Sequence, residues 1–185
     1  MTCADSSIAR LEDEVAALRT QLDALSRAQM DNRATFCLIS DDFEKVLTVL
    51  MLAHSAAAMD MECSIFFAFW GVQAVKRDSR YRGKPAIEKA LTAMLAANIG
   101  GLPSTKYHLA GLGPAIFSKL MRDKGIATPA DLMQTAVQAG IGLRACATSM
   151  EMLGIAPDEL LPGVECAGAS GFLELGVRSR VSLIL

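Results

Sequence analysis

The sequence contains no long uninterrupted apolar run, although 52% of its 185 residues are hydrophobic. Its longest stretches without Asp, Glu, Lys or Arg are 14, 13 and 16 residues, at Val46–Met59, Cys63–Val75 and Ala90–Thr105. A membrane-spanning helix needs roughly 20 apolar residues. Residues 2–30 are too charged to be a secretory signal. We therefore expect a cytoplasmic protein with no membrane span and a large apolar core.

A net charge of either sign is also nearly missing, as are aromatic residues and histidine. The 18 Lys and Arg almost balance the 20 Asp and Glu, aromatic residues make up 5% of the chain, and there are two His. Nucleic-acid binding needs a clustered basic face, so no nucleic-acid partner is expected. The sequence has no GxGxxG fingerprint and no phosphate loop. We therefore expect no nucleotide and no other cofactor.

The five cysteines show no metal-binding pattern. They are irregularly spaced and include no CxxC pair, which argues against structural zinc or another metal site. An odd number of cysteines without an export signal indicates free thiols in a reducing compartment. The question is then whether one of these thiols is reactive.

The first 30 residues differ from the rest of the chain. Apolar residues recur there at alternating spacings of three and four, as an a/d heptad seam: Ile8, Leu11, Val15, Leu18, Leu22 and Leu25. Such a narrow apolar stripe with charged flanks favours a coiled-coil helix at residues 1–30 that assembles several copies of the chain. The alternative is an amphipathic helix docked on its own domain. Polar residues Gln29–Arg33 are predicted to form a linker.

Residues 35–185 alternate between strand and helix patterns, which predicts an α/β domain. The strands are expected at Phe36–Ser40, Glu62–Phe69, Ile141–Ala145, Val164–Cys166 and Arg180–Leu185. The helices are expected at Phe43–Met59, Pro85–Asn98, Pro114–Lys124, Pro129–Ala139 and Ala169–Val177, with a short one ending at Leu153. Strands joined by helical crossovers form a mainly parallel sheet that helices cover on both faces.

Cys146 stands where chemistry is expected in such a fold. Ligands of open parallel sheets bind beyond the carboxyl ends of the strands. Cys146 directly follows one predicted strand and precedes a helix that Thr148 or Ser149 would cap. The positive end of a helix stabilises a thiolate, the nucleophilic form of cysteine. Position alone leaves a buried, inert thiol as an open alternative. Trp70 and Gly71 extend past the end of another strand and are expected to wall the same pocket.

Six segments carry a more specific resemblance. They are Ser40–Lys45, Ala56–Glu62, Phe66–Gly71, Ala145–Ile155, Gly163–Glu165 and Phe172–Leu175. In this order they resemble the DsrE/DsrF-like family, and more narrowly its DsrE-related sulfurtransferase branch, which is also described as peroxiredoxin-like. The resemblance covers about residues 35–185. It implies a three-layer α/β/α fold, homo-oligomers, and cytoplasmic sulfur relay through a persulfide on the family's cysteine, which corresponds to Cys146.

The leading hypothesis is therefore a sulfur carrier or sulfurtransferase with Cys146 as its catalytic residue. It hands sulfane sulfur to a TusA-like or rhodanese-like partner and forms a trimer or tetramer. Substrate-binding roles are expected for the backbone N–H groups and side chains of Ala147, Thr148, Ser149, Met150, Trp70 and Gly71.

Two competing hypotheses belong to other classes. The heptad seam favours a non-catalytic assembly or regulatory module. A thiol peroxidase would need a Pro-x-x-x-Thr-x-x-Cys pattern, which the residues before Cys146 do not provide. The sulfur donor, the acceptor and the pathway are left open. So is the question whether Cys63 or Cys166 assists Cys146.

Overall fold

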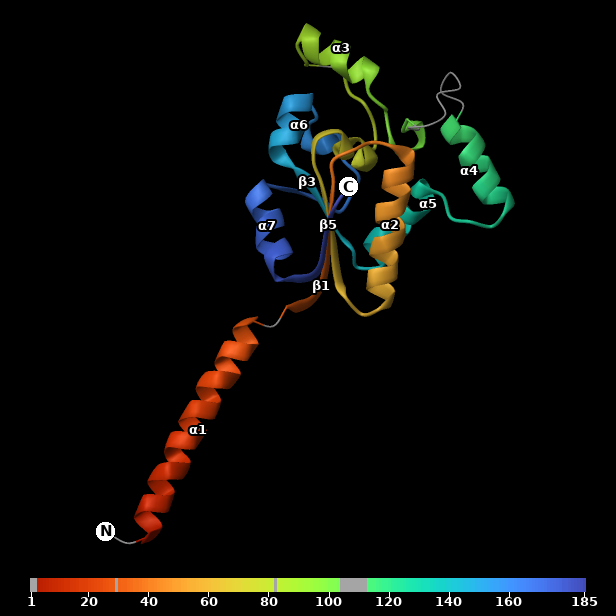
Figure 1. The fold of residues 1–185 in the computed structure, drawn as a ribbon. Helices are drawn as coiled ribbons and strands as arrows, with labels where there is room; N and C mark the ends of the chain where they lie inside the picture. The colour runs from red at the N-terminus through yellow and green to blue at the C-terminus, as the bar shows by residue number, and fades with distance from the viewer. Residues whose placement is uncertain (1–2, 29, 82, 104–112) are drawn as a thin grey trace. The chain divides into compact units, whose positions relative to one another are not determined.

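The computed structural model describes residues 3–28, 30–81, 83–103 and 113–185 (Figure 1). The strands are β1 (Asp31–Leu38), β2 (Glu62–Phe67), β3 (Gly142–Cys146), β4 (Val164–Ala167) and β5 (Ser179–Ile184). The α-helices are α1 (Cys3–Ala28), α2 (Phe43–Ala58), α3 (Ala86–Met94), α4 (Gly113–Asp123), α5 (Pro129–Gln138), α6 (Ala147–Leu153) and α7 (Ala169–Arg178). Short 3-10 helices are η1 (Phe69–Val75), η2 (Ile99–Gly101) and η3 (Pro157–Glu159).

The strands form one five-stranded sheet in the order β4-β3-β2-β1-β5. Neighbouring strands from β1 to β4 pair in parallel. At the β1–β5 edge, Leu185 N–H donates to Cys37 O at 2.8 Å and Ile39 N–H donates to Leu185 O at 2.9 Å. Leu185 is thus hydrogen-bonded to Cys37 and to Ile39, two residues apart on β1, and this is the hydrogen-bond pattern of parallel strands. The predicted α/β fold class with a parallel sheet is confirmed.

Strand register divides the sheet into two unlike faces. Phe36, Ile65 and Leu143 lie side by side in one row across three strands, and each is at most 2% exposed. Because successive side chains of a strand point to opposite faces, the next row lies on the other face. That row contains Cys37, Phe66 and Arg144. The main core is therefore on the Phe36 face, and the Cys37 face carries a smaller apolar cluster of Cys37, Phe66, Ala68 and Cys146.

Helices cover both faces and complete the three layers. On the main core face, α2 buries Val46, Val49, Leu50 and Ala53, the i, i+3, i+4, i+7 stripe of an amphipathic helix. Helix α5 lies beside α2 on the same side of the sheet, whereas α7 lies on the opposite side (Figure 1). The three-layer α/β/α architecture is confirmed.

Some expected boundaries are wrong. Strand β1 begins at Asp31, so the predicted linker fails at Asp31–Arg33, while Gln29 lies outside the described residues. The extra strand residues are held by cross-strand partners: Arg33 forms an ion pair with Glu62 at 2.5 Å, and Asn32 donates to Asp60 O at 2.9 Å. The polarity of these residues suggested a linker, but polar residues at the end of a strand can form hydrogen bonds and ion pairs with the neighbouring strand.

Strand β2 also stops earlier than expected, at Phe67 instead of Phe69. Phe69 adopts φ +47, a left-handed conformation that a strand cannot continue. The chain there turns into η1, whose Gly71 packs against β1. A Cβ atom at Gly71 would lie 2.1 Å from the carbonyl oxygen of Leu38, so only glycine fits.

Helix α1 and the residues from Asn32 onward form separate compact units. Within α1 the seam residues Leu11, Val15, Leu18 and Leu22 are 46–67% exposed. The N-terminal helix is thus present, and its role as a coiled coil stays a prediction. Among the helices of the described ranges, none is both long enough and apolar enough to cross a membrane.

Candidate functional site

Cys146 is the last residue of β3 and the residue that begins α6. It serves as the N-cap, with φ −68 and ψ 115, and Ala147 is the first helical residue. The prediction that Thr148 or Ser149 would cap this helix is wrong, because the strand passes directly into the helix without a loop. Helix α6 ends at Leu153, and its C-cap Gly154 adopts φ 65. The thiol therefore lies at the carboxyl end of a central strand, as expected for a functional residue of a parallel sheet.

An apolar cavity of about 440 Å³ opens beside Cys146. Its walls come from β1, β2, η1, β3, α6, α7 and β5, so segments far apart in the sequence build it together. They contribute Cys37, Ile39, Phe66, Ala68, Phe69, Cys146, Thr148, Ser149, Met152, Ala169, Phe172 and Ile184. Cys146 itself is 7% exposed, and several residues of the rim, among them Phe69, are about half exposed. The cavity therefore connects a buried thiol with the surface.

Cys37 is a second thiol of this cavity, and its position within a strand gave no sign of this in the sequence. It lies on β1 in the same row as Phe66, whereas Cys146 lies two residues beyond Arg144, the next member of that row. The two thiols thus share one face of the sheet, with β2 between their strands. Burial raises the pKa of Cys37 from 9.0 to about 11, and the neighbouring Cys146 adds to the increase. Cys37 therefore stays a neutral thiol at physiological pH.

The outer wall of the cavity comes from the last two elements, α7 and β5. The ring of Phe172 stacks on Phe66 with centroids 5.5 Å apart. At the start of β5, the buried hydroxyl of Ser179 is 2.7 Å from the hydroxyl of Thr35 on β1. Sequence patterns could not reveal these wall residues, because they meet Cys146 only through the strand order of the sheet. The signal available in the sequence was that Phe66 alternates with the core residues of β2, which directs its side chain to the other face of the sheet.

The side chain of Ser149 links α6 to η1 through a hydrogen bond. Its hydroxyl oxygen accepts a hydrogen bond of 2.9 Å from the backbone N–H of Phe69, and the side chain is buried. This contact holds Phe69 at the rim in its left-handed conformation. Of the predicted site residues, Cys146, Thr148 and Ser149 line the cavity together.

The other predicted site residues do not line it. Met150 packs in the main core on the opposite side, 3% exposed, and Met152 stands at the cavity in its place. Ala147 is exposed, Gly71 is pressed against Leu38, and Trp70 is 45% exposed. Phe69, one residue before Trp70, supplies the aromatic wall, because the strand ended earlier than expected.

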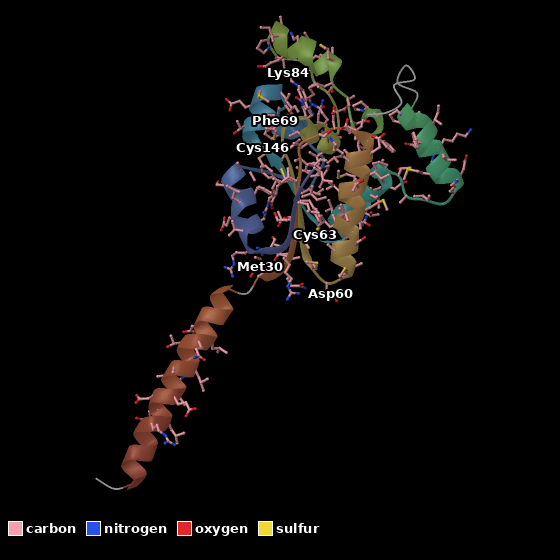
Figure 2. All side chains as sticks on the ribbon, viewed as in Figure 1. Met30, Asp60, Cys63, Phe69, Lys84 and Cys146 are labelled. Atoms are coloured by element: carbon pink, nitrogen blue, oxygen red, sulfur yellow. The ribbon has the colours of Figure 1, made fainter. Side chains whose placement is uncertain are left out.

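Neither of the two cysteines considered as helpers reaches Cys146. Cys166 pairs with Ala145, so it points to the opposite face, where its sulfur lies 3.8 Å from the sulfur of Met150. Cys63 pairs with Ala34 on the core face. Figure 2 shows Cys146 and Phe69 toward one end of the sheet and Cys63 and Asp60 toward the other. In the described part of the chain, no group of three or more His, Cys, Asp or Glu side chains is arranged to hold a metal ion.

Fold and site together define a three-layer α/β protein with a thiol at the end of a central strand. The model of the DsrE/DsrF/DrsH-like family matches residues 30–184, and the chain belongs to this family. It is 29% identical over 158 residues to an uncharacterized protein, YrkE, of Bacillus subtilis, covering 85% of this chain and 99% of that protein.

A second relative has a name that states a function. Over 139 residues the chain is 27% identical to the sulfur carrier protein DsrE2 of Allochromatium vinosum, covering 73% of this chain and 86% of the relative. Among solved structures, the ychN protein of E. coli matches with a TM-score of 0.46 and 11% identity, over 83% of this chain and 99% of that one. The family and the DsrE2 relative support a role in sulfur relay in general.

Proposed function

We propose that the protein carries sulfane sulfur as a persulfide on Cys146 and passes it to a thiol of a partner protein. The observation that carries the proposal is the position of Cys146, at the carboxyl end of β3 and open to the apolar cavity. The membership in the DsrE/DsrF/DrsH-like family and the similarity to a sulfur carrier support it. The proposal locates the carrier in the cytoplasm, where thiols remain reduced.

Two displacements make up the proposed transfer. The Cys146 thiolate attacks the outer sulfur of a persulfide donor, so a new S–S bond forms on Cys146 and the donor leaves as a thiolate. A thiolate of the acceptor then attacks the outer sulfur on Cys146 and restores the cysteine. Neither step needs an external oxidant or reductant. Proteins of the TusA-like or rhodanese-like kind are the proposed partners, since they present such a thiol.

The apolar walls give the proposed persulfide a protected place. Phe66, Phe172 and Met152 border the cavity and limit the access of water and oxidants to a sulfur held on Cys146. Cys37 beside them is kept neutral by burial, so it does not compete as a nucleophile.

We further propose that α1 assembles the protein into a homo-oligomer. Its a/d residues Leu11, Val15, Leu18 and Leu22 are exposed along the helix, as expected for a seam that a second copy would bury. This favours an assembly role for the N-terminal unit alongside the sulfur-carrying role of the α/β unit.

Mass spectrometry after incubation with a persulfidated donor tests the main proposal. The wild-type protein should gain one sulfur on the peptide that contains Cys146, and Cys146→Ser should not gain it. Cys166→Ser is the matched control, because Cys166 lies on the next strand but faces away from the cavity. It should load like the wild type. Undiminished loading of Cys146→Ser would refute the proposal.

A further inference from the structure

The walls of the cavity beside Cys146 are unusually poor in polar groups for a site that would receive an inorganic sulfur compound. Apart from the two thiols, the lining side chains with a polar atom are Thr148 and Ser149. The hydroxyl oxygen of Ser149 already accepts the backbone hydrogen bond from Phe69. The remaining walls are aromatic rings, alkyl groups and the thioether of Met152.

No charged side chain lines the cavity within the residues that the structure describes. The cation placed nearest to Cys146 along β3 is Arg144, on the same face but outside the cavity lining. Its Nε atom lies 3.3 Å from a carboxylate oxygen of Glu165, so its charge is compensated. An anion that enters the cavity would lose hydration and meet no cationic side chain beyond the short α6 N-terminus beside Cys146, which is unfavourable. A neutral molecule meets no such penalty.

The sulfur atoms of the cavity lie on different walls. Cys37 comes from β1, Cys146 from β3 and Met152 from α6, with the ring of Phe66 on the strand between the two thiols. Divalent sulfur is soft and polarizable and makes favourable contacts with aromatic rings. A volume of about 440 Å³ lies within the range of small-molecule sites. The cavity therefore matches an uncharged, sulfur-rich molecule in size and surface.

We propose that the sulfur donor that this site prefers over anionic persulfides and polysulfides is uncharged sulfane sulfur, namely the ring of elemental sulfur, cyclo-octasulfur, bound in the apolar cavity next to Cys146. This inference rests on the proposed function and specifies its substrate class. The Cys146 thiolate, its proton having gone to water, attacks one sulfur atom of the ring. A bond from Cys146 to that atom forms while one ring S–S bond breaks. The electron pair of the broken bond leaves on the far end of the opened chain, which becomes a terminal thiolate at the exposed rim of the cavity, where water solvates its charge.

The competing donors are anionic, and a comparison of loading rates separates them from the neutral ring. Reduced full-length protein is incubated with cyclo-octasulfur in dilute ethanol, with inorganic tetrasulfide, or with glutathione persulfide, at equal sulfane sulfur. Peptide mapping by mass spectrometry follows sulfur addition at Cys146. We expect elemental sulfur to load Cys146 about tenfold faster than either anion. The anions lose their hydration on entering the cavity and find no cationic side chain there to compensate for it. Equal or faster loading by the anions overturns the inference.

A larger side chain that fills the cavity should slow the loading of Cys146 from elemental sulfur. Ala169, at the start of α7, lines the cavity, and Ala169→Phe places a ring in the space of the ligand. Leu173→Phe is the control, since Leu173 lies on the same helix, is 59% exposed and does not line the cavity. We expect severalfold slower loading from elemental sulfur with Ala169→Phe and an unchanged rate with Leu173→Phe. Equal rates in both variants count against the site.

A charge at the rim provides a test that does not depend on core packing. Ile184 lines the cavity and is 65% exposed, so Ile184→Lys adds a cation without disturbing buried contacts. It should raise the rate of loading from tetrasulfide relative to elemental sulfur. Val181→Lys, on the same strand and outside the lining, should leave that ratio unchanged. An unaltered ratio in Ile184→Lys contradicts the electrostatic argument.

The results also separate this inference from the proposed function. If the anionic donors load Cys146 and elemental sulfur does not, the carrier role stands and the substrate class is wrong. If no donor loads Cys146, the proposed function fails as well.

Discussion

Two buried thiols of the α/β unit ionise with more difficulty in the folded chain than in the unfolded chain. Burial raises the pKa of Cys37 and of Cys63 from 9.0 to about 11. Below pH 9.0 both states of the protein keep these protons. Between pH 9.0 and about 11 the unfolded chain loses them while the folded chain retains them. The contribution of these thiols to stability is therefore complete below pH 9.0 and disappears as the pH rises through 11.

Denaturant unfolding of Cys37→Ala across this pH range tests the argument at the level of a single residue. The variant should lose part of the decrease in the free energy of unfolding that the wild type shows above pH 9.0. Cys166→Ala removes an exposed thiol and should keep the wild-type slope. An unchanged slope in Cys37→Ala would mean that burial does not hold back its ionisation.

At the scale of elements, a buried charge cluster joins η1 to η3 and to the segment between them. The Nζ of Lys84 lies 2.6 Å from a carboxylate oxygen of Glu159, whose side chain is 1% exposed. Lys76, also buried, donates to Ser79 at 3.0 Å and to the carbonyl of Ala96 at 3.1 Å. Burial lowers the pKa of Lys76, while the nearby Glu159 opposes that change.

Glu159→Gln should therefore cost stability. The variant leaves two largely buried ammonium groups without a counter-charge, and removal of one partner of a buried pair costs about 3–5 kcal/mol. Asp158→Asn is the matched control, because the ion pair of Asp158 with Arg80 is exposed and such pairs contribute about 0–1 kcal/mol. Thermal or denaturant unfolding of both variants measures the difference. Comparable losses in the two variants would contradict a special role for Glu159.

Most helices and strands could be predicted from the sequence, because the residue patterns that mark them are local. Thr128 caps α5 through a reciprocal capping box with Asp131, as its position before Pro129 predicts. The apolar spacing of α2 likewise gave its length. Errors arose where a distant partner decides the structure. Glu62 pairs with Arg33 at the start of β1, and the carbonyl of Leu38 leaves room only for a glycine at position 71 in the turn after β2.

The candidate site was predictable only in part for the same reason. Cys146 followed from the rule that functional residues lie at the carboxyl ends of parallel strands. Cys37, Phe172 and Ile184 could not be found this way, because their approach to Cys146 depends on strand order and on which face each residue takes. Met150 was assigned to the pocket although the turn of α6 directs it into the core and brings Met152 to the cavity.

For the whole molecule, the N-terminal helix gives a prediction about assembly. Leu18→Asp places a charge in the seam and should lower the molar mass measured by light scattering, because a carboxylate cannot be buried there without a partner. Ala17→Asp lies one residue away, outside the a/d pattern, and should leave the mass unchanged. If Leu18→Asp has the same mass as the wild type, the helix does not mediate assembly.

The attachment of α7 has a consequence for access to Cys146. None of the side chains of α7 is fully buried, and β5 is an edge strand with one neighbour. Segments with few buried contacts open locally at a lower free energy than the whole fold. Excursions of the α7–β5 segment would uncover Cys146 while β1, β2 and β3 stay paired. If Cys146 carries sulfur as proposed, the opening equilibrium of that segment, visible as fast amide hydrogen exchange, sets how often an acceptor protein finds Cys146 fully uncovered.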